Sequence, residues 1–264
     1  MFNRDTVIND LKKIREQSPL VHNITNYVVM NNTANALLAI GASPVMAHAT
    51  EEAADMVNIA GSLVLNIGTL SRAWIEAMQK ALEAAEKKGI PVVLDPVGAG
   101  ATPLRTDTCI RLLEQGGLTV IRGNASEIMA LTNAASSTKG VDSTHSAADA
   151  LGSAKSLAEQ YGCVVTISGS RDYITDGATV LEINNGTPML TRVTGMGCTA
   201  TALTGAFTAV NSDMLTAAAA AMSVMSIAGE LAEKISNGPG SMQANFLDVL
   251  YSLDEEDIRS TFRE

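Results

Sequence analysis

The sequence predicts an α/β fold with a mostly parallel central sheet and helices on both of its faces. Between residues 62 and 132, short runs that are apolar throughout alternate with longer segments of helical periodicity. Such runs are typical of parallel strands that are covered on both faces. Unexpected polar residues, Asp95 and Arg122 among them, stand where these runs end, and parallel sheets bind ligands at the carboxyl ends of their strands.

The first 60 residues begin this alternation. The periodicity predicts an amphipathic helix over 5–17, a strand over 20–24 and an apolar, asparagine-containing helix over 27–40. A short strand over 43–47 then precedes a helix over 51–60, whose first turn is acidic, as the helix dipole favours.

The middle of the chain is the most regular part. The expected strands are 63–67, 91–95, 118–122 and 163–168, and the expected helices are 72–88, 105–115, 125–132 and 147–161. Residues 133–145 are small and polar and predict a loop, and 172–183 predict an antiparallel hairpin around Asp176-Gly177, a dipeptide that hairpin turns favour.

The last third begins with a β-branched run over 188–193, which predicts a strand leading into a glycine-rich turn. Helices are expected over 199–210, over the Ala-rich segment 214–234, and again after the glycines and proline of 238–240. Without an internal repeat or a linker, the chain is expected to form a single domain over residues 1–264.

Composition narrows the range of partners. A net charge of -10 argues against a nucleic-acid or acidic-membrane partner, because either would require a basic face. The polar N-terminus predicts no signal peptide, and no apolar run is expected to reach membrane length, so the sequence predicts a cytoplasmic protein. Three cysteines without metal-ligand spacing suit a reducing compartment.

The glycine-rich turn over 193–201 is the principal candidate site. Gly195 and Gly197 permit a tight turn, and the helix that follows presents N–H groups that have no intrahelical partner. These groups and the positive end of the helix dipole suit a phosphoryl group, and Cys198 would project from the same first turn. An ordinary strand-to-helix connection with a buried cysteine is the alternative.

Three charged residues strengthen the phosphoryl hypothesis. Asp95 follows an apolar strand and could bind a hard cation, directly or through water, and Glu127 would lie in the first turn of the next helix. Arg122 ends an apolar strand, where an arginine is expected to meet an anion. Helix capping and dipole compensation are the alternative roles of the two carboxylates, but all these groups on one rim predict phosphoryl transfer.

Seven blocks, in order over residues 19–250, carry a family resemblance. They are PLVHNITN at 19–26, GASPVMA at 41–47, LNIGTL at 65–70, LDPVGAGAT at 94–102, RGNASEI at 122–128, VTGMGC at 193–198 and GPGS at 238–241. With these blocks the chain resembles the hydroxyethylthiazole kinase family of the ribokinase-like superfamily, which acts in thiamine salvage. The resemblance implies a ribokinase-like three-layer sandwich, ATP as co-substrate and magnesium (Mg²⁺) as cofactor.

The resemblance also implies a role for each matching residue. Met46, Asn26 and Gly195 would contact the thiazole alcohol, Arg122, Ser168 and Thr194 would contact ATP, Asp95 and Glu127 would hold magnesium, and Gly195, Gly197 and Cys198 would form the catalytic anion hole. Cys198 stands where the superfamily has an aspartate that receives the substrate's proton. Core packing is the alternative role of Met46, and capping is that of Asn26. The resemblance further implies a homotrimer with sites between subunits.

The predicted reaction is in-line transfer of the γ-phosphoryl group of ATP to the primary hydroxyl of 4-methyl-5-(2-hydroxyethyl)thiazole. One alternative is a kinase of the same fold that acts on another alcohol, such as a pyrimidine or a sugar. A second, of a different class, is an ATP-binding regulator without turnover. A cysteine hydrolase is a third, but His22, His48 and His145 have no sequence relation to Cys198 that would supply a base.

Overall fold

The computed structural model describes residues 2–135 and 150–264, and the strands of these residues form one sheet in the order β2-β1-β3-β4-β5-β6-β7-β8. The strands are β1 Leu20–Ile24, β2 Ser43–Val45, β3 Ser62–Asn66, β4 Val92–Asp95, β5 Val120–Asn124, β6 Val164–Ser168, β7 Asp172–Thr175 and β8 Val180–Ile183. Strands β1 to β6 pair in parallel, and β7 and β8 add an antiparallel hairpin at one edge. The expected mostly parallel sheet is confirmed.

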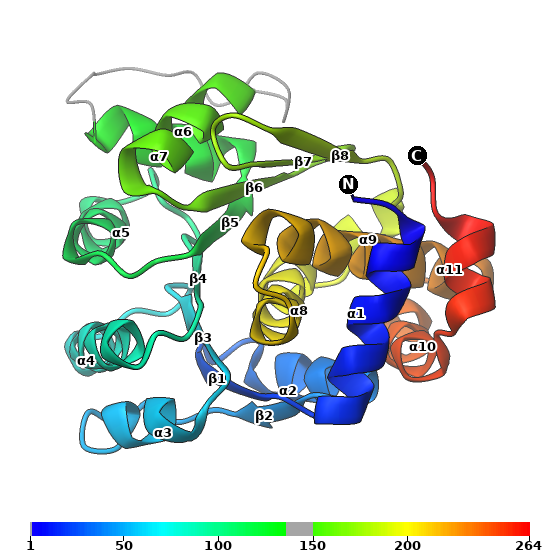
Figure 1. The fold of residues 1–264 in the computed structure, drawn as a ribbon, viewed down its shortest axis with the longest axis horizontal. Coiled ribbons are helices and arrows are strands. Elements are labelled where there is room, and N and C mark those ends of the chain that lie inside the picture. The colour runs from blue at the N-terminus through cyan, green and yellow to red at the C-terminus, as the bar shows by residue number, and fades with distance from the viewer. Residues whose placement is uncertain (1, 136–149) are drawn as a thin grey trace.

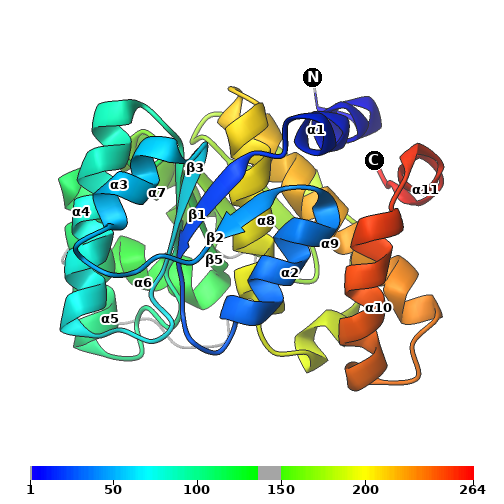
Figure 2. The same cartoon turned by 90° about the horizontal axis from the view of Figure 1, so that it is seen from below.

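Helices cover both faces of this sheet. They are α1 Arg4–Gln17, α2 Met30–Ile40, α3 Ala53–Ile59, α4 Arg72–Lys88, α5 Pro103–Gln115, α6 Ala125–Ala135, α7 Leu151–Tyr161, α8 Met196–Val210, α9 Met214–Lys234, α10 Pro239–Ser252 and α11 Glu255–Thr261. In Figures 1 and 2, α3 to α7 lie on one face, and α1, α2 and α8 to α11 lie on the other. The result is the three-layer sandwich that the sequence predicted.

Alternation along the strands divides the core in two. Val64 and Val93 face the layer that contains α8, whereas Leu65 and Leu94 face the layer that contains α4. Successive strand side chains point to opposite faces, so each strand supplies apolar residues to both layers. This explains why the strand sequences are apolar throughout.

Helix α9 departs from the expectation that no apolar run reaches membrane length. Its length of 21 residues and its hydropathy of 1.5 would allow it to cross a membrane, but 78% of the apolar window is buried inside the protein. The helix packs against α8, α10 and the hairpin strands. Its composition therefore reflects a position in the core.

The strand expected over 188–193 is wrong, because Pro188–Arg192 is a 3-10 helix, η1. Pro188 has no N–H to give to a strand ladder, and the Thr187 side chain caps the turn by accepting from Met189 N. Helix α8 then begins at Met196, three residues before the expected start. The glycine-rich turn consequently joins a 3-10 helix, and not a strand, to α8.

Several other boundaries differ by one to three residues, and one of these elements is β5, at Val120–Asn124 in place of 118–122. Helix α2 begins at Met30 and not at residue 27, and α6 continues to Ala135, into the segment expected to be a loop. The rest of the 133–145 loop and the start of the 147–161 helix lie outside the described residues.

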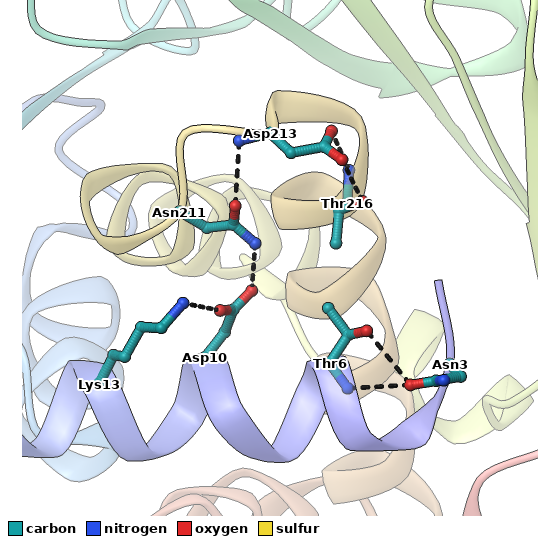
Figure 3. A network of polar contacts seen from close by, with 7 residues as sticks. All are labelled: Asn3, Thr6, Asp10, Lys13, Asn211, Asp213 and Thr216. Carbon is teal, nitrogen blue, oxygen red and sulfur yellow. Dashed lines mark hydrogen bonds and ion pairs between the residues drawn. The ribbon is translucent and has the colours of Figure 1, made fainter. Parts of the chain in front are cut away.

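A polar network ties α1 to the connection between α8 and α9 (Figure 3). The buried carboxylate of Asp10 accepts from Asn211 Nδ2 at 2.6 Å and pairs with Lys13 Nζ at 2.9 Å. Asn211 Oδ1 accepts from the Asp213 amide, and the Asp213 carboxylate caps α9 by accepting from Thr216 N at 3.1 Å. This network lies at the end of α8 opposite the glycine-rich turn.

Candidate active site

The candidate site lies where the carboxyl ends of β1, β3, β4 and β5 meet the first turn of α8. These strands are parallel neighbours, and Asn66 at the end of β3 is the register partner of Asp95 at the end of β4. Their last residues therefore point to one rim of the sheet. Helix α8 lies on the sheet face that also carries α1 and α2, and it packs on β1, β3 and β4.

A chain of hydrogen bonds crosses this rim. Asn26 Nδ2 donates to Asn66 Oδ1 at 2.8 Å, and Asn66 Nδ2 donates to Asp95 Oδ2 at 2.6 Å. The same Asp95 oxygen accepts from Thr201 Oγ1 at 2.8 Å, and Asn26 Nδ2 lies 3.5 Å from the Cys198 sulfur. The carboxylate of Asp95 is thus fixed between β3 and α8, and Cys198 lies against the same network.

The first turn of α8 presents free amide groups. Gly195 has φ +82°, which a residue with a side chain rarely adopts, and a Cβ there would lie 2.6 Å from Val29 Cγ1. The first intrahelical bond of the turn runs from Thr199 N to Gly195 O at 2.8 Å. The amides of Met196, Gly197 and Cys198 precede it and remain available to an anion.

Arg122 supplies a buried cation beside these amides. A Cβ on Gly197 would lie only 2.8 Å from Arg122 Nη1, so the guanidinium group lies directly against the first turn of α8. Arg122 is 8% exposed, and within the described residues its Nε has no hydrogen-bond partner. Burying a cation this way is costly unless an anion binds it.

Asp95 and Glu127 form the acidic part of the site. Burial raises the pKa of Asp95 to about 6, Arg122 opposes that shift and Glu127 adds to it. Glu127 accepts from the backbone amides of Gly98 and Asn124, both at 2.8 Å, and its place in the first turn of α6 also suits the alternative role of helix-dipole compensation. Two hard oxygen donors that repel each other would both be stabilised by a divalent cation.

The two carboxylates suit magnesium better than a metal whose ligands all come from protein side chains. Across residues 2–135 and 150–264, no group of three His, Cys, Asp or Glu side chains could hold a metal. Magnesium usually takes one or two carboxylates and completes its shell with water and substrate phosphates. Asp95 and Glu127 match that pattern.

A cavity of about 500 Å³ opens beside Arg122 and Gly197. Polar lining comes from the ends of β5 and β6 and includes Asn124 and Ser168. Apolar lining comes from η1, α8 and α9: Pro188, Leu190, Met196, Ala200, Met222 and Met225. A ligand with an anionic part and an apolar part would match this lining.

Cys198 is a weak acid in this environment. Burial raises the pKa of its thiol to about 11, and the Asp95 carboxylate adds to the shift. The ring nitrogens of His22 and His48 contact the carbonyls of Ala47 and Met46, and His145 lies outside the described residues. These contacts supply no base for the cysteine hydrolase alternative.

The structure gathers most of the residues that the sequence singled out. Asn26, Asp95, Arg122 and Cys198 lie together, and Ser168 lines the cavity with Arg122 and Gly197. Thr194 is exposed in the turn, and Met46 follows the edge strand β2, two strands from β3.

No role was predicted for three residues of the site: Asn66, Thr201 and Asp172. Asn66 follows an apolar strand, and Thr201 lies in the 193–201 segment one helical turn after Gly197, so their positions could have indicated both. Asp172 lines the cavity and accepts from Gly169 N at 2.9 Å. Its sequence context predicted only the start of a hairpin.

Comparisons with known proteins show the family of the chain. A model of the hydroxyethylthiazole kinase family matches residues 11–256. The chain is 58% identical over 254 residues to the hydroxyethylthiazole kinase of Syntrophus aciditrophicus, covering 96% of this chain and 94% of that one. It is similar to the solved hydroxyethylthiazole kinase of Pyrococcus horikoshii OT3, with a TM-score of 0.92, 44% identity and 98% of both chains covered. A ribokinase-like superfamily protein of Enterococcus faecalis has the same fold, with a TM-score of 0.63, 13% identity and 96% and 95% coverage.

Proposed function

The chain belongs to the hydroxyethylthiazole kinase family and is an enzyme that phosphorylates hydroxyethylthiazole; from this premise, we propose how its residues do so. The γ-phosphoryl group of ATP passes in line to the primary hydroxyl of 4-methyl-5-(2-hydroxyethyl)thiazole. The product is the thiazole phosphate for thiamine salvage, with ADP released.

One observation carries the assignment of the phosphoryl site. The buried Arg122 guanidinium, with an unpartnered Nε among the described residues, lies against the free amides that open α8. Phosphoryl transfer is catalysed mainly by positioning and by stabilising charge on the equatorial oxygens. The amides from Gly195 to Cys198 and the guanidinium group are placed to do this.

ATP would occupy the cavity beside Arg122. Its phosphates would lie at the polar lining from β5, β6 and the start of α8, with Ser168 and Thr194 near them, and its base against the apolar lining from η1 and α9. The adenine would then lie near Met222 and Met225, and no contact is proposed for the 133–145 loop. That loop lies largely outside the described residues.

Magnesium would be held by Asp95 and Glu127, directly or through water. When bound, it would neutralise charge on the phosphates. Asn66 and Thr201 would keep the Asp95 carboxylate oriented toward the rim by their hydrogen bonds. Arg122 would balance the two carboxylates when the site is empty.

The thiazole would lie near Asn26, Gly195 and Met46. The Asn26 amide group reaches Cys198 within one chain, and the neighbouring Tyr27 and Val28 are 65% and 66% exposed. Large apolar side chains exposed beside a site suit an interface, so they support a homotrimer with sites completed between subunits. Light scattering that gave a monomer mass at working concentration would contradict the trimer.

We also propose a cytoplasmic enzyme without a nucleic-acid or membrane partner. The net charge of -10 opposes both kinds of anionic partner, and the one helix of membrane length among the described residues is mostly buried. Fractionation of cells that express the protein, followed by immunoblotting, tests this location. Recovery in the membrane fraction after a salt wash would contradict it.

The test is ADP release from purified protein with ATP and magnesium, with and without hydroxyethylthiazole. A pyrimidine alcohol and ribose serve as comparison substrates. Thiazole-dependent ADP release, with an equal amount of phosphorylated thiazole by mass spectrometry, is expected. ADP release with another alcohol but not with the thiazole would show that the proposed substrate is wrong. ATP binding without any ADP release would favour the regulatory alternative.

A further inference from the structure

The wall of the cavity formed by Asn185, Gly186 and Thr187 has no secondary structure of its own. It is held instead by Glu230 of α9, a carboxylate that is 9% exposed. Glu230 Oε1 accepts from the Gly186 amide at 2.6 Å and from Asn185 Nδ2 at 3.1 Å. The carboxylate therefore replaces the strand partners that this segment lacks.

The C-terminus of the chain completes this arrangement. Arg263 Nη2 donates to Glu230 Oε2 at 2.9 Å, and Arg263 Nη1 donates to the Asn184 carbonyl at 3.0 Å. The Arg263 backbone amide donates to Asn185 Oδ1 at 2.9 Å, and Asn185 Nδ2 donates to the Thr261 carbonyl at 2.9 Å. Segments about 78 positions apart in sequence are thus joined at one wall of the cavity.

These contacts make one unit, the C-terminal clamp, defined by Glu230, Arg263 and Asn185. The charge-assisted bond from Arg263 neutralises Glu230, which in turn fixes the Gly186 amide. Gly186 has φ +134°, a conformation that only glycine adopts readily, and its amide is bonded to Glu230. Without the clamp, the wall would be free to take other conformations.

We propose that Arg263 and Glu230 are positioning residues for the nucleotide: they hold the cavity wall in the shape that accepts the base and sugar of a nucleoside triphosphate. The inference rests on the proposed function of the cavity as the ATP site. The 185–187 wall lines the cavity, whereas Asn26 and Cys198, on the proposed thiazole side of the rim, do not. The effect of the clamp is therefore specific to the nucleotide.

The test compares Arg263→Ala with Arg259→Ala. Arg259 lies on the adjacent α11 and makes exposed ion pairs with Asp5 and Glu255, and within the described residues it makes no ion pair with the cavity wall. The dissociation constant of a non-hydrolysable ATP analogue is measured by calorimetry, and KM is measured separately for ATP and for the thiazole. Melting temperatures are recorded for both variants.

For Arg263→Ala, the analogue is expected to bind roughly tenfold more weakly and the KM for ATP to rise equally, since one charge-assisted contact of this kind is worth about that factor. The KM for the thiazole and all values for Arg259→Ala should stay within about twofold of wild type. Arg263→Lys keeps the charge beside Glu230 and should recover part of the loss. If Arg263→Ala is poorly folded, the nucleotide affinity and KM values of Arg263→Lys are compared with those of Arg259→Ala instead.

Unchanged nucleotide affinity in folded Arg263→Ala and Arg263→Lys would overturn the proposal. An equal rise in both KM values would also overturn it, because it would indicate a general structural role. The two failures are distinguishable: wild-type protein that binds the analogue but does not phosphorylate the thiazole would refute the proposed function while leaving the binding comparison valid. Wild-type protein that binds no nucleotide would overturn both.

Discussion

Cys198 is the residue whose role the structure alters most. Its thiol lies against Asn26 and near Asp95, and burial raises its pKa to about 11, so the protonated form prevails at neutral pH. A loose phosphoryl transition state leaves the proton on the attacking hydroxyl until late. The sulfur is therefore better placed to orient the hydroxyl than to remove its proton.

We accordingly expect Cys198→Ser to keep measurable turnover, within about 10²-fold of wild type, the low end of what a general base contributes. Asp95→Ala and Glu127→Ala should lose more, because each removes a proposed magnesium ligand and leaves part of the network unpaired. Steady-state kinetics over a range of magnesium concentrations would measure this. An inactive Cys198→Ser beside active Asp95→Ala and Glu127→Ala would reverse the ranking.

Asp172 gives a prediction on pH. Burial raises the pKa of this carboxyl from its ordinary value of 3.8 to about 6, against the effects of the Gly169 amide and Arg122. Because the folded state holds the proton more tightly, this group's contribution to stability falls as pH rises from about 4 to about 6. Asp172→Asn removes that dependence and keeps an oxygen for the Gly169 amide.

Urea unfolding at pH 4 and pH 7 would test this expectation. Relative to wild type, Asp172→Asn should gain about 2 kcal/mol of unfolding free energy between the two pH values. Asp248→Asn, which removes an exposed carboxyl on α10, serves as the control. If the unfolding free energy of Asp172→Asn differed from that of wild type by the same amount at both pH values, the expectation would be refuted.

At the residue scale, the sequence indicated which residues belong to the site better than it indicated their hydrogen-bond partners. Asp95, Arg122 and Cys198 were identifiable because a charge after an apolar strand, or a thiol after glycines, is unusual. The bonds that fix Asp95 to Asn66 and Thr201 were not predictable, since they depend on how deeply α8 packs on β3 and β4. Asp172 was missed because an aspartate at the start of a hairpin has an ordinary structural explanation.

Among the elements, α8 connects the core to the site. Its Gly205 lies so close to the sheet that an added Cβ would be 2.6 Å from Val64 Cγ2 and 3.0 Å from Val21 Cγ1. The small residue allows the helix to approach β1 and β3, and this approach brings its first turn to Asp95. Larger residues at position 205 would push the helix outward.

Gly205→Ala should therefore destabilise the protein by about 1–3 kcal/mol, as is typical of overpacking, despite alanine's higher helix propensity. Gly240→Ala is the matched control: it lies in the first turn of α10, and no described atom lies within 4 Å of the added Cβ. That variant should be neutral or slightly stabilised. Chemical denaturation would measure the unfolding free energies of both variants. Equal values for Gly205→Ala and Gly240→Ala would show that α8 can shift away from the sheet without loss of stability.

The elements that the sequence predicted well have strong periodicity or a clear cap. Helix α4, for example, was expected over the same residues that it occupies, from the Ser71 cap to Gly89. The strand expected over 188–193 failed because β-branched composition was weighed above Pro188, which has no N–H, and above the Thr187 cap. Local propensity indicated a strand where the hydrogen bonds available favour a 3-10 turn.

At the scale of the whole molecule, we propose that the 264 residues fold as one domain. All strands of the described residues share one sheet, and α8 packs on three of them while α9 reaches the hairpin. Unfolding followed by fluorescence of the sole tryptophan, Trp74, should coincide with unfolding followed by far-UV circular dichroism. Two separate transitions would indicate more than one folding unit.

The position of α1 has a consequence for synthesis. Its buried residues, Val7, Ile8, Leu11 and Ile14, belong to the core that α8 and α9 complete, and α1 packs chiefly on these helices and on α11. The ribosome must therefore add residues 18–195 before the main partners of α1 exist, which takes on the order of 10–40 s at about 5–20 residues per second.

During that interval the first helix carries an uncovered apolar stripe, so we expect nascent chains to depend on a holding chaperone. Ribosome-bound chains arrested at residue 195 should be cleaved by trypsin at Lys12 or Lys13, while full-length chains extended by a linker should resist. Equal protection of both would mean that α1 is covered early by something other than its final partners. In the finished protein, α8 and α9, which are made long after α1, are the helices that bury it.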